Sequence, residues 1–441
     1  MCRKIQSHFT DKTPQENKII CLSNQQIMNK DVPIIDKLAG IELYSTKFDG
    51  IGGSIKVKNE DFKVIEILVE SISSDISRIS DKSYKFPILL LEKKGLDSNH
   101  AIIEIFNQLG IKIRVLGIKD SKAVTTQYAT CEGKKFGEGK TPHTNLTLLG
   151  FSKHSIKKSH IMGNQFEIKI SNPLKNDILE FITEIKNIPN YYGLQRFGSE
   201  RLVTHLVGRE IIKRNFKKAV EIFLCHTTEY DTQFSKEIRE KCNDPKNYGH
   251  VMKIIPRGMD LERNLLRSLI DGKGYISTLR SVPINIRRLF VHAFQAFMFN
   301  KCLSSMIKNG EPISCCIKND FCFKLENQLT LGKLMKYQDH SFTNLVPAMH
   351  LPGYSFKSTD GRFERKLSFL MKEENISAKD FYIKEMQELS VEGGFRQLPL
   401  LVNDFSYYDN LLVKFKIPIG SYATILLREL MKPEDPIKSG F

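Results

Sequence analysis

Strand-like sequence at both ends of the chain encloses a long helical stretch, and this order limits the folds open to it. Before Pro189, apolar residues alternate with polar ones in several runs, as in residues 53–70 and 166–170. Residues 199–390 instead carry apolar residues at helical spacing, and strand-like alternation returns at residues 411–417. We therefore expect the terminal strand to rejoin the first sheet, which a second, helix-rich unit interrupts.

Length and element order suggest two domains of mixed class. At 441 residues the chain is too long for one ordinary core. The order strand, helix, strand, strand over residues 86–131 favours an α+β fold with the helices on one face of the sheet. Residues 1–40 are polar without sustained periodicity, and they predict a loosely held, flexible N-terminal extension.

The charge balance favours a polyanionic partner. Lys and Arg number 66 against 50 Asp and Glu, which gives a formal net charge of +16. RNA or DNA is a better match than an anionic membrane, although a lysine-rich organism is an alternative explanation. Basic clusters at residues 153–158 and 213–218 are candidates for RNA-backbone contacts, and a solvated face explains each almost as well.

Metal and membrane motifs are not found. The nine cysteines form no Cys-x-x-Cys pair, and no His-Glu-x-x-His sequence occurs, so we expect no structural zinc. The most apolar helical candidate, residues 289–299, falls short of the ~20 residues that a membrane span needs. The first residues lack the apolar core of a signal peptide.

A short stretch after a predicted strand carries the main candidate for chemistry. Ile111, Ile113 and Val115 alternate as in a half-buried strand, and Gly117 ends the pattern. Asp120 follows, so we expect its carboxylate on a turn at a sheet edge, a common place for catalytic side chains.

Two interpretations of this turn remain open from the residues alone. Lys119 directly precedes Asp120, and a nearby cation would favour the ionised form of the carboxyl group. An aspartate and a lysine in a turn are, however, more often turn formers and a solvated charge pair.

Several stretches resemble the TruD family of pseudouridine synthases. The segment GIKDSKAVTTQ, residues 117–127, is similar to the family signature G-x-K-D-x-x-A-x-T-x-Q, and PNYYGLQRFG at 189–198 is the most specific of the other matches. Forms such as VHAFQ and GSYATILLREL lean toward the archaeal and eukaryotic branch. The further stretches, in the family's order, are GSIKVKNEDFKVIEI (53–67), LLEKKGLDSNHAIIEIFNQLGI (90–111), HIMGNQF (160–166), VHAFQAFMFN (291–300), LPGY (351–354) and PIGSYATILLREL (418–430).

This resemblance implies a definite domain organisation. Residues 41–196 and 396–441 would form a pseudouridine-synthase catalytic domain of α+β class, built on a mixed, largely antiparallel sheet. A helix-rich insertion unique to TruD proteins would occupy residues 197–395, beginning at the Gln-Arg-Phe-Gly motif.

The resemblance also implies the residues of a base-binding site. Asp120 would be the catalytic nucleophile, and Phe62, Asn164 and Phe166 would surround the target base. Asn164 can hydrogen-bond to the edge of uracil, and an aromatic face can stack on the ring. Without the family, the two phenylalanines would be ordinary core residues and Asn164 a turn residue.

Other residues have two interpretations each. Tyr422 would supply another ring to the pocket, or face the core as an ordinary helix residue. Lys56 and Glu60 would form a charged layer around the substrate site, or a plain surface pair. Arg196 would bind phosphate or hold the hinge between the domains, and the glycines around it favour the hinge. For His205 a structural role is favoured over catalysis.

The implied activity is the conversion of uridine to pseudouridine in RNA. The favoured substrate is tRNA, modified in the D-arm region, and other structured RNA is a further one. The reaction needs no net redox change, so we expect no cofactor and no metal. We expect a cytoplasmic enzyme, or a nuclear one in a eukaryote, without membrane contact, and a monomer is favoured.

Two other kinds of protein are the alternatives. One is a non-catalytic RNA-binding protein of the same fold. The other is a nucleoside hydrolase or base-excising glycosylase, which typically activates a water molecule through a second acid or a metal, and no such cluster is found in the sequence.

Overall fold

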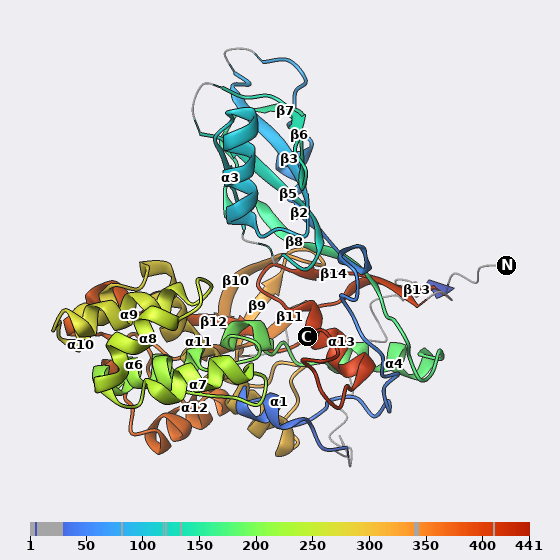
Figure 1. Ribbon diagram of the computed structural model, residues 1–441. Coiled ribbons are helices and arrows are strands. Elements are labelled where there is room, and N and C mark those ends of the chain that lie inside the picture. Colours follow the sequence, from blue (N-terminus) through green and yellow to red (C-terminus); the bar gives the residue numbers. More distant parts are fainter. Residues whose placement is uncertain are drawn as a thin grey trace.

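One large sheet runs through both parts of the molecule, a smaller lobe and the larger body on which it stands (Figure 1). The structure is a computed structural model that describes residues 5–6, 30–80, 83–117, 119, 121–132, 135–338, 344–408 and 411–441. Within these residues the sheet has ten strands. In spatial order they are β1 (Ile5–Gln6), β13 (Asn403–Tyr408), β14 (Leu412–Pro418), β8 (Ile161–Lys169), β2 (Phe62–Leu68), β5 (Val124–Cys131), β3 (Phe86–Lys94), β7 (Thr144–Ser152) and β6 (Gly139–Lys140), with β4 (Ile113–Val115) beside β5.

The sheet is mixed and largely antiparallel, as predicted. Among the described strands, β2 and β5 form the parallel pair, and the other neighbours are antiparallel. The C-terminal strand β14 pairs with β8 so that Phe415 lies opposite Phe166. This pairing confirms that the end of the chain rejoins a sheet begun before residue 170.

The apolar spacing of Ile102, Ile105, Phe106 and Leu109, with Asp97 or Ser98 as a possible cap, predicts an amphipathic helix over residues 97–109. Helix α3 (Ser98–Leu109) matches this prediction and covers the lobe's part of the sheet. The Asp97 carboxylate accepts hydrogen bonds from two backbone N–H groups of the first turn, and Gly110 ends the helix with a φ of 67°. Ala101 and Ile105 are buried, whereas Phe106, expected to face inward, is 54% exposed. Phe106 lies about 100° around the helix from Ile105 and therefore beyond the buried stripe.

Most of the body lies between η4 (Leu194–Phe197) and β13. Helix α5 (Thr204–Ile212) packs on the long helix α11 (Ile284–Lys308), and a Cβ atom at Gly208 would lie 1.9 Å from a backbone oxygen of α11. The apolar spacing over residues 202–224 predicts one long helix, but the chain forms two helices there, because Arg214 has a φ of 60°. The other helices here are α6 (Phe216–Cys225), α7 (Gln233–Lys241), α8 (Tyr248–Ile254), α9 (Asp260–Ile270), α10 (Tyr275–Arg280) and α12 (Arg362–Glu373).

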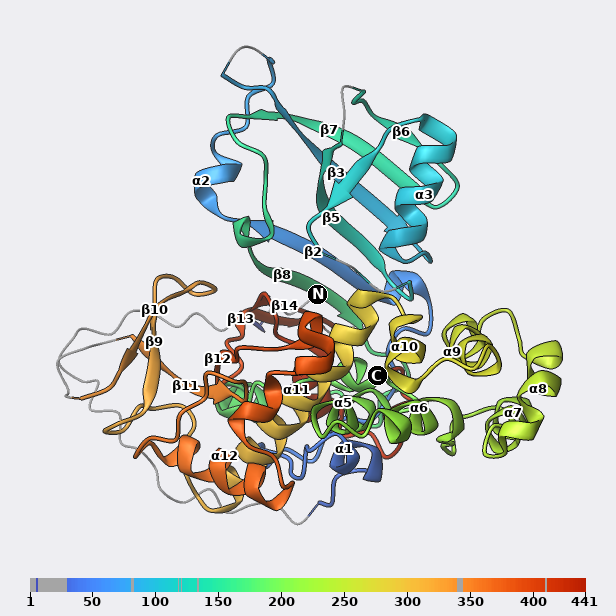
Figure 2. The ribbon, with the colours of Figure 1, turned by 90° about the vertical axis from the view of Figure 1, so that its left-hand side faces the viewer.

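The inserted chain also contains a second sheet, which the helical interpretation of residues 199–390 missed. Its strand order is β10 (Leu331–Lys336), β9 (Phe321–Leu325), β11 (Leu345–Leu351) and β12 (Gly394–Gln397). Figure 2 shows this sheet on one side of the body and α7 to α9 on the other, with α11 between them. The insertion is therefore helix-rich, but a four-stranded sheet forms part of it.

The C-terminal helix α13 (Ala423–Met431) follows β14, as the sequence predicts. The sequence predicts Ser421 as the cap of this helix, but Tyr422 holds the N-cap position, and the buried hydroxyl of Ser421 has no hydrogen-bond partner. Short elements before the insertion are α2 (Glu70–Ser73) and α4 (Leu179–Glu184).

The expected loose extension over residues 1–40 is wrong for residues 30–40. Here α1 (Ile34–Leu38) is anchored by Ile35 and Ala39, which are buried against residues of η4 and α11. Residues 5–6 form β1, which pairs with β13. These partners lie far along the sequence, so local periodicity gives no sign of them; residues 1–4 and 7–29 lie outside the described residues.

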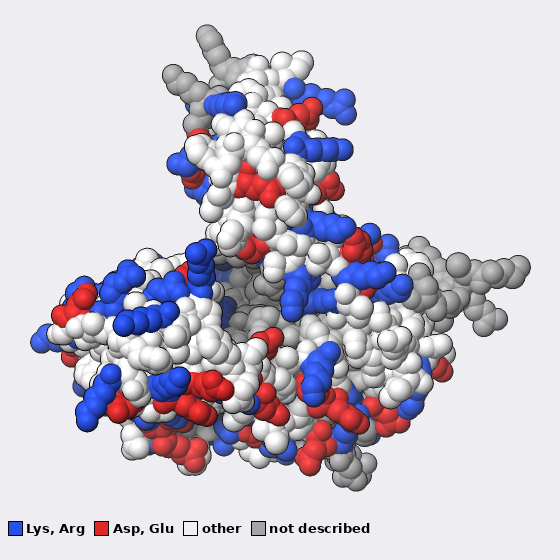
Figure 3. Space-filling model, viewed as in Figure 1, with Lys and Arg blue, Asp and Glu red and all other residues white. Residues whose placement is uncertain are grey.

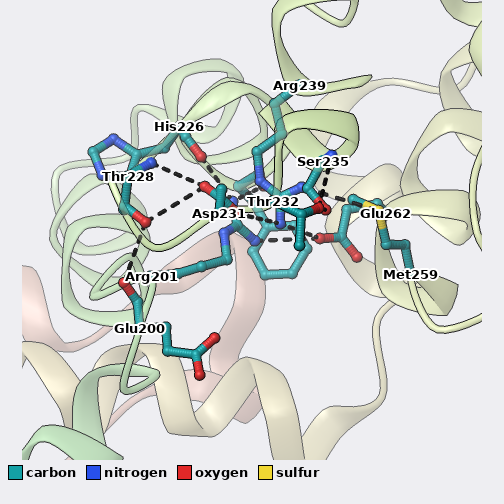
Figure 4. Close-up of polar contacts among 11 residues, drawn as sticks. Glu200, Arg201, His226, Thr228, Asp231, Thr232, Ser235, Arg239, Met259 and Glu262 are labelled. Atoms are coloured by element: carbon teal, nitrogen blue, oxygen red, sulfur yellow. Dashed lines mark hydrogen bonds and ion pairs between the residues drawn. The ribbon is translucent and has the colours of Figure 1, made fainter. Parts of the chain in front are cut away.

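A buried charge cluster joins helices α7 and α9 of the body (Figure 4). The Arg239 guanidinium on α7 lies 3.5 Å from a Glu262 oxygen on α9 and 3.6 Å from Asp231. Arg201 contacts the same Glu262 oxygen at 3.2 Å and donates to two backbone carbonyls. Two cations thus meet two carboxylates, and we interpret the cluster as structural.

His205 on α5 is a buried, structural residue rather than part of the site. Its ring stacks on Phe297 at 4.9 Å and meets Phe197 edge-on at 5.3 Å, while Nδ1 has no hydrogen-bond partner. Burial, reinforced by the Arg209 cation and by the nearby His226, lowers the pKa of His205 to about 3. The ring is therefore neutral in the folded protein at ordinary pH.

This lowered pKa predicts a loss of stability in mild acid. Below pH 6.5 the unfolded chain binds a proton at His205 and the folded chain does not, so stability falls as the pH falls. At pH 5 the cost is about 2 kcal/mol relative to pH 7.5. Urea unfolding at both pH values should show that His205→Phe removes this part of the pH dependence. The same change at the exposed His154 should leave it in place, and an unchanged slope in His205→Phe would contradict the prediction.

Candidate active site on the sheet face

One face of the large sheet is apolar at both ends and polar in its middle. In the lobe, Leu89, Leu91 and Ala129 pack beneath α3 in one hydrophobic core. At the other end, the rings of Phe166 and Phe415 stack 5.3 Å apart in a second core that continues into the body. Between the two cores lie buried polar side chains on neighbouring strands, of which Glu66, Thr125, Gln127 and Asn164 concern the site.

The strand register brings these four residues together. Glu66 of β2 lies directly opposite Asn164 of β8, and Thr125 of β5 lies opposite Val64 of β2. Residues directly opposite one another, and those two positions further on, point to the same face. The alternation around Phe166 predicts that Asn164 shares its face if the strand extends back that far, and β8, which begins at Ile161, confirms this.

Lys119 joins two of these side chains in one network. Its ammonium group donates to Oδ1 of Asn164 at 2.7 Å and lies 3.2 Å from Oε1 of Glu66. Oε2 of Glu66 accepts a hydrogen bond from the backbone N–H of Tyr128 at 2.9 Å. The Glu66 side chain is only 2% exposed, so its charge is compensated by the Lys119 cation rather than by water.

Ser98 and Gln127 hold the backbone of the same segment. The Ser98 hydroxyl accepts from the N–H of Lys119 at 2.9 Å and donates to the side-chain oxygen of Gln127 at 3.2 Å. The Gln127 amide in turn donates to the carbonyl of Gly117 at 3.3 Å. Ser98 and Gln127 are both fully buried, so the chain on this side of the turn has a fixed path.

Asp120, the predicted nucleophile, lies outside the described residues. Its neighbours Lys119 and Ser121 are described, and they lie in the segment between β4 and β5. The Lys119 ammonium contacts Glu66 and Asn164, so its described partners are on the sheet face.

The predicted aromatic residues lie in the second core beside the polar network. Phe62 and Phe166 meet edge-on at 6.0 Å, and both are more than nine-tenths buried. Lys56 has a φ of 57°, and its ammonium lies 4.9 Å from the centre of the Phe62 ring. The two phenylalanines therefore support the face on which Asn164 lies.

Glu60 and Tyr422 are not brought into this network. Glu60 forms an ion pair with Lys94 in which both side chains are about half exposed, which matches the surface-pair interpretation with a partner other than Lys56. The hydroxyl of Tyr422 accepts a hydrogen bond from Arg196 at 3.2 Å, and its ring meets Tyr192 edge-on. Arg196 thus links η4 to the start of α13, in keeping with the favoured hinge role.

The two predicted basic clusters differ in their partners. Lys213, Lys217 and Lys218 each lie within 4 Å of a carboxylate, so acidic neighbours offset their charge. In the other cluster, Lys153 pairs with Asp75, while residues 157–158 are exposed. The structure thus favours a structural interpretation for residues 213–218, and RNA contact by residues 153–158 stays a prediction.

Reasoning from the sequence missed three members of the network, namely Glu66, Ser98 and Gln127. The sequence does contain an indication for Glu66, because it alternates in step with Phe62 and Leu68, the buried residues of β2. A charged residue at such a position must find a partner. Ser98 was noted only as a possible helix cap, although Asp97 caps α3.

The surface is hollowed where the lobe meets the body, near β8 (Figure 3). Lys and Arg side chains stand on both sides of this hollow, which suits a polyanionic ligand. A separate open cavity of about 450 Å³ lies at the far end of β5, lined in part by Lys85 and Arg114. Because that cavity shares no residue with the Lys119 network, we do not assign it to the site.

Neither a metal cluster nor a membrane span is found in the described part of the chain. No three His, Cys, Asp or Glu side chains converge there in a way that could hold a metal ion. Each helix among the same residues is too short or too polar to cross a bilayer.

A fixed polar network on a sheet face suits an enzyme, and the net positive charge, with Lys and Arg side chains beside the surface hollow, suits a polyanionic substrate. Comparison with known proteins specifies the class. The family model described as tRNA pseudouridine synthase D (TruD) matches residues 38–430. The chain therefore belongs to the TruD family of pseudouridine synthases, which are isomerases, as the sequence motifs predicted.

Individual relatives agree with this assignment. A probable tRNA pseudouridine synthase D of Methanococcoides burtonii is 31% identical, over 92% of this chain and 99% of that protein. One of Archaeoglobus fulgidus is 30% identical, over 91% and 100%. The crystal structure of the putative tRNA pseudouridine synthase D from Methanosarcina mazei superposes with a TM-score of 0.73 at 28% identity, covering 93% of this chain and all of that one.

Proposed function

We propose that this protein converts a specific uridine of tRNA, in the D-arm region, to pseudouridine with Asp120 as the nucleophile. The observation that carries the proposal is the buried network of Lys119, Glu66 and Asn164. It lies on the sheet face and includes Lys119, the residue that precedes Asp120 in the sequence, and the chain is a member of the TruD family. A preorganised polar site of this kind needs no rearrangement when the reaction begins.

The proposed reaction is an isomerisation within one nucleotide. The bond between N1 of uracil and C1′ of the ribose breaks, the base turns, and a bond between C5 and C1′ forms. The proton on C5 is lost and N1 gains one, so atoms and electrons balance without a cofactor. The Asp120 carboxylate acts by attacking C1′ or by assisting departure of the base to a glycal.

The target uridine must leave its stack to reach this site, which costs a few kcal/mol. We assign Asn164 to the edge of the extruded uracil. Phe62 and Phe166 form the apolar support behind it, and Lys56 lies on the outer side of the Phe62 ring. Glu60 and Tyr422 have contacts of their own elsewhere, so we assign them to the rim and the hinge instead.

The partners and location follow from the same proposal. We propose a tRNA substrate held in the basic hollow, with other structured RNA as a further substrate. The enzyme would act as a monomer in the cytoplasm, or in the nucleus of a eukaryote.

The proposal is tested by incubating the purified protein with unmodified tRNA transcripts and mapping pseudouridine chemically at single-nucleotide resolution. We expect conversion at one position in the D-arm region. Conversion at a different position would overturn the D-arm assignment alone. RNA binding without product would favour a non-catalytic RNA-binding protein, and release of free uracil would favour a glycosylase.

The backbone contacts of Ser98 yield a separate prediction. Ser98→Ala removes the acceptor for the Lys119 N–H and the donor to Gln127, so the Asp120 turn loses a fixed support. We expect kcat for pseudouridine formation to fall by about 100-fold, because small displacements of a reacting group are costly. The affinity for tRNA should change by less than about threefold, since the hydroxyl is buried.

Ser121→Ala is the matched control for this experiment. It removes a hydroxyl from the same turn at an exposed position, so kcat should stay within about twofold of the original protein. An unchanged kcat in Ser98→Ala would show that these hydrogen bonds do not position the turn.

A further inference from the structure

The side-chain amide of Asn164 is held in one of its two orientations. An amide has an oxygen that accepts hydrogen bonds and an NH2 group that donates two, and rotation by 180° exchanges them. The Lys119 ammonium lies 2.7 Å from Oδ1 of Asn164. Because an ammonium group has donors and no acceptor, the group that faces it must be the oxygen.

The cation that fixes this orientation is itself fixed. Lys119 lies 3.2 Å from Glu66, and its side chain is only 15% exposed. Glu66 accepts from the backbone N–H of Tyr128 at 2.9 Å on its other oxygen. The Lys119 backbone is bound by Ser98 at 2.9 Å. The backbone N–H of Tyr128 thus holds the Glu66 carboxylate, and the carboxylate holds the Lys119 ammonium group. The ammonium group in turn holds the Asn164 amide.

This arrangement decides what Asn164 can offer to a ligand. The charge-assisted bond to Lys119 takes one lone pair of the oxygen and holds that oxygen toward the ammonium group, so the NH2 group, on the other branch of the amide, is the donor that Asn164 can offer to a base. Uracil carries an acceptor, O4, where cytosine carries an amino group, which is a donor. An Asn164 that presents its NH2 group would match O4 of uracil at this position and meet a second donor on cytosine.

We propose that Lys119 is a positioning residue that makes the site select uridine over cytidine, by holding Asn164 as a donor to O4 of the target base. This inference rests on the proposed function and assigns a cause to its base specificity. Lys119 need not touch the substrate, because it acts through Asn164. A buried donor facing a donor leaves both groups unpaired, which is costly in a site with little water.

The test compares the affinity for two RNAs in Lys119→Met and in the original protein. The RNAs are the unmodified tRNA transcript in which the target uridine has been mapped, and the same transcript with cytidine there. All proteins carry Asp120→Asn so that the uridine is not converted. We expect the original protein to prefer uridine by about 10-fold or more, and Lys119→Met to reduce the preference to about twofold, because its Asn164 amide is free to rotate.

Two further variants separate this role from a general loss of charge or of structure. Lys122→Met removes an exposed lysine from the same turn, so it should keep the full preference for uridine. Lys119→Arg keeps donors toward both Glu66 and Asn164, and we expect it to keep most of the preference. Thermal unfolding of each variant shows whether the fold is kept.

The outcomes distinguish this inference from the proposed function. An equal preference in Lys119→Met and the original protein would overturn the role of Lys119, and equal affinity for both RNAs in the original protein would overturn the donor role of Asn164. In either case pseudouridine formation by the unmodified enzyme would still stand. Loss of that formation in the mapping experiment would remove the proposed function itself.

Discussion

Asp120→Asn is expected to abolish pseudouridine formation while tRNA binding is kept. The change removes the negative charge that attacks C1′ or assists departure of the base, and it conserves the size of the side chain. We expect the single-turnover rate to fall by at least about 1000-fold, as loss of a nucleophile does in other enzymes. The measurement is pseudouridine formed on a tRNA transcript at saturating enzyme, with the dissociation constant determined in parallel.

The control for this experiment is Asp360→Asn, which makes the same change at an exposed aspartate in the body. It should leave both rate and affinity within about twofold. A rate in Asp120→Asn within about 10-fold of the original would place the chemistry on another residue. Loss of tRNA binding would instead show that Asp120 has a structural or electrostatic role in the complex.

The parts of the fold that were predicted correctly have local signals. Helix α3 has a capping aspartate at one end and a glycine at the other, and β14 is a run of alternating apolar residues. The α1 segment was misjudged, because its buried residues depend on partners in η4 and α11. The second sheet was missed for a similar reason: β9 pairs with β11, whose residues lie well beyond it along the chain.

Some residues of the site could likewise be predicted from the sequence, whereas the contacts between them could not. The family motifs led to Asn164, Phe62 and Phe166, and the alternation of β8 placed Asn164 and Phe166 on one face. The contacts that fix Asn164 join residues far apart in sequence: Lys119 is 45 positions from Asn164 and 21 positions from Ser98. The periodicity of a sequence cannot indicate contacts between residues so far apart, so these contacts are seen only in the folded structure.

A cluster of deeply buried charges joins α1 to α13. Arg428 of α13 lies 2.6 Å from a carboxylate oxygen of Asp36 and 3.0 Å from one of Glu429. Its guanidinium also donates to the carbonyl of Leu43 and lies 4.1 Å from the ring centre of Tyr44. All three charged side chains are almost completely buried. The α1 segment is thereby fastened to the C-terminal helix.

Arg428→Met is expected to destabilise the protein severely. The variant keeps most of the side-chain volume but leaves the carboxylates of Asp36 and Glu429 buried without their cation. Removing one partner of a buried ion pair costs about 3–5 kcal/mol. Urea denaturation should show a decrease of that size in the free energy of unfolding. Limited proteolysis should show earlier cleavage near α1, because Asp36 no longer holds it.

Two comparisons make this prediction specific. Arg365→Met makes the same change at an exposed arginine of α12, so the free energy of unfolding should change by less than about 0.5 kcal/mol. Adding Asp36→Asn to Arg428→Met should recover part of the lost stability, because one unpaired charge is then removed. If Arg428→Met proved as stable as Arg365→Met, the buried charges would not be what fastens α1 to the C-terminal helix.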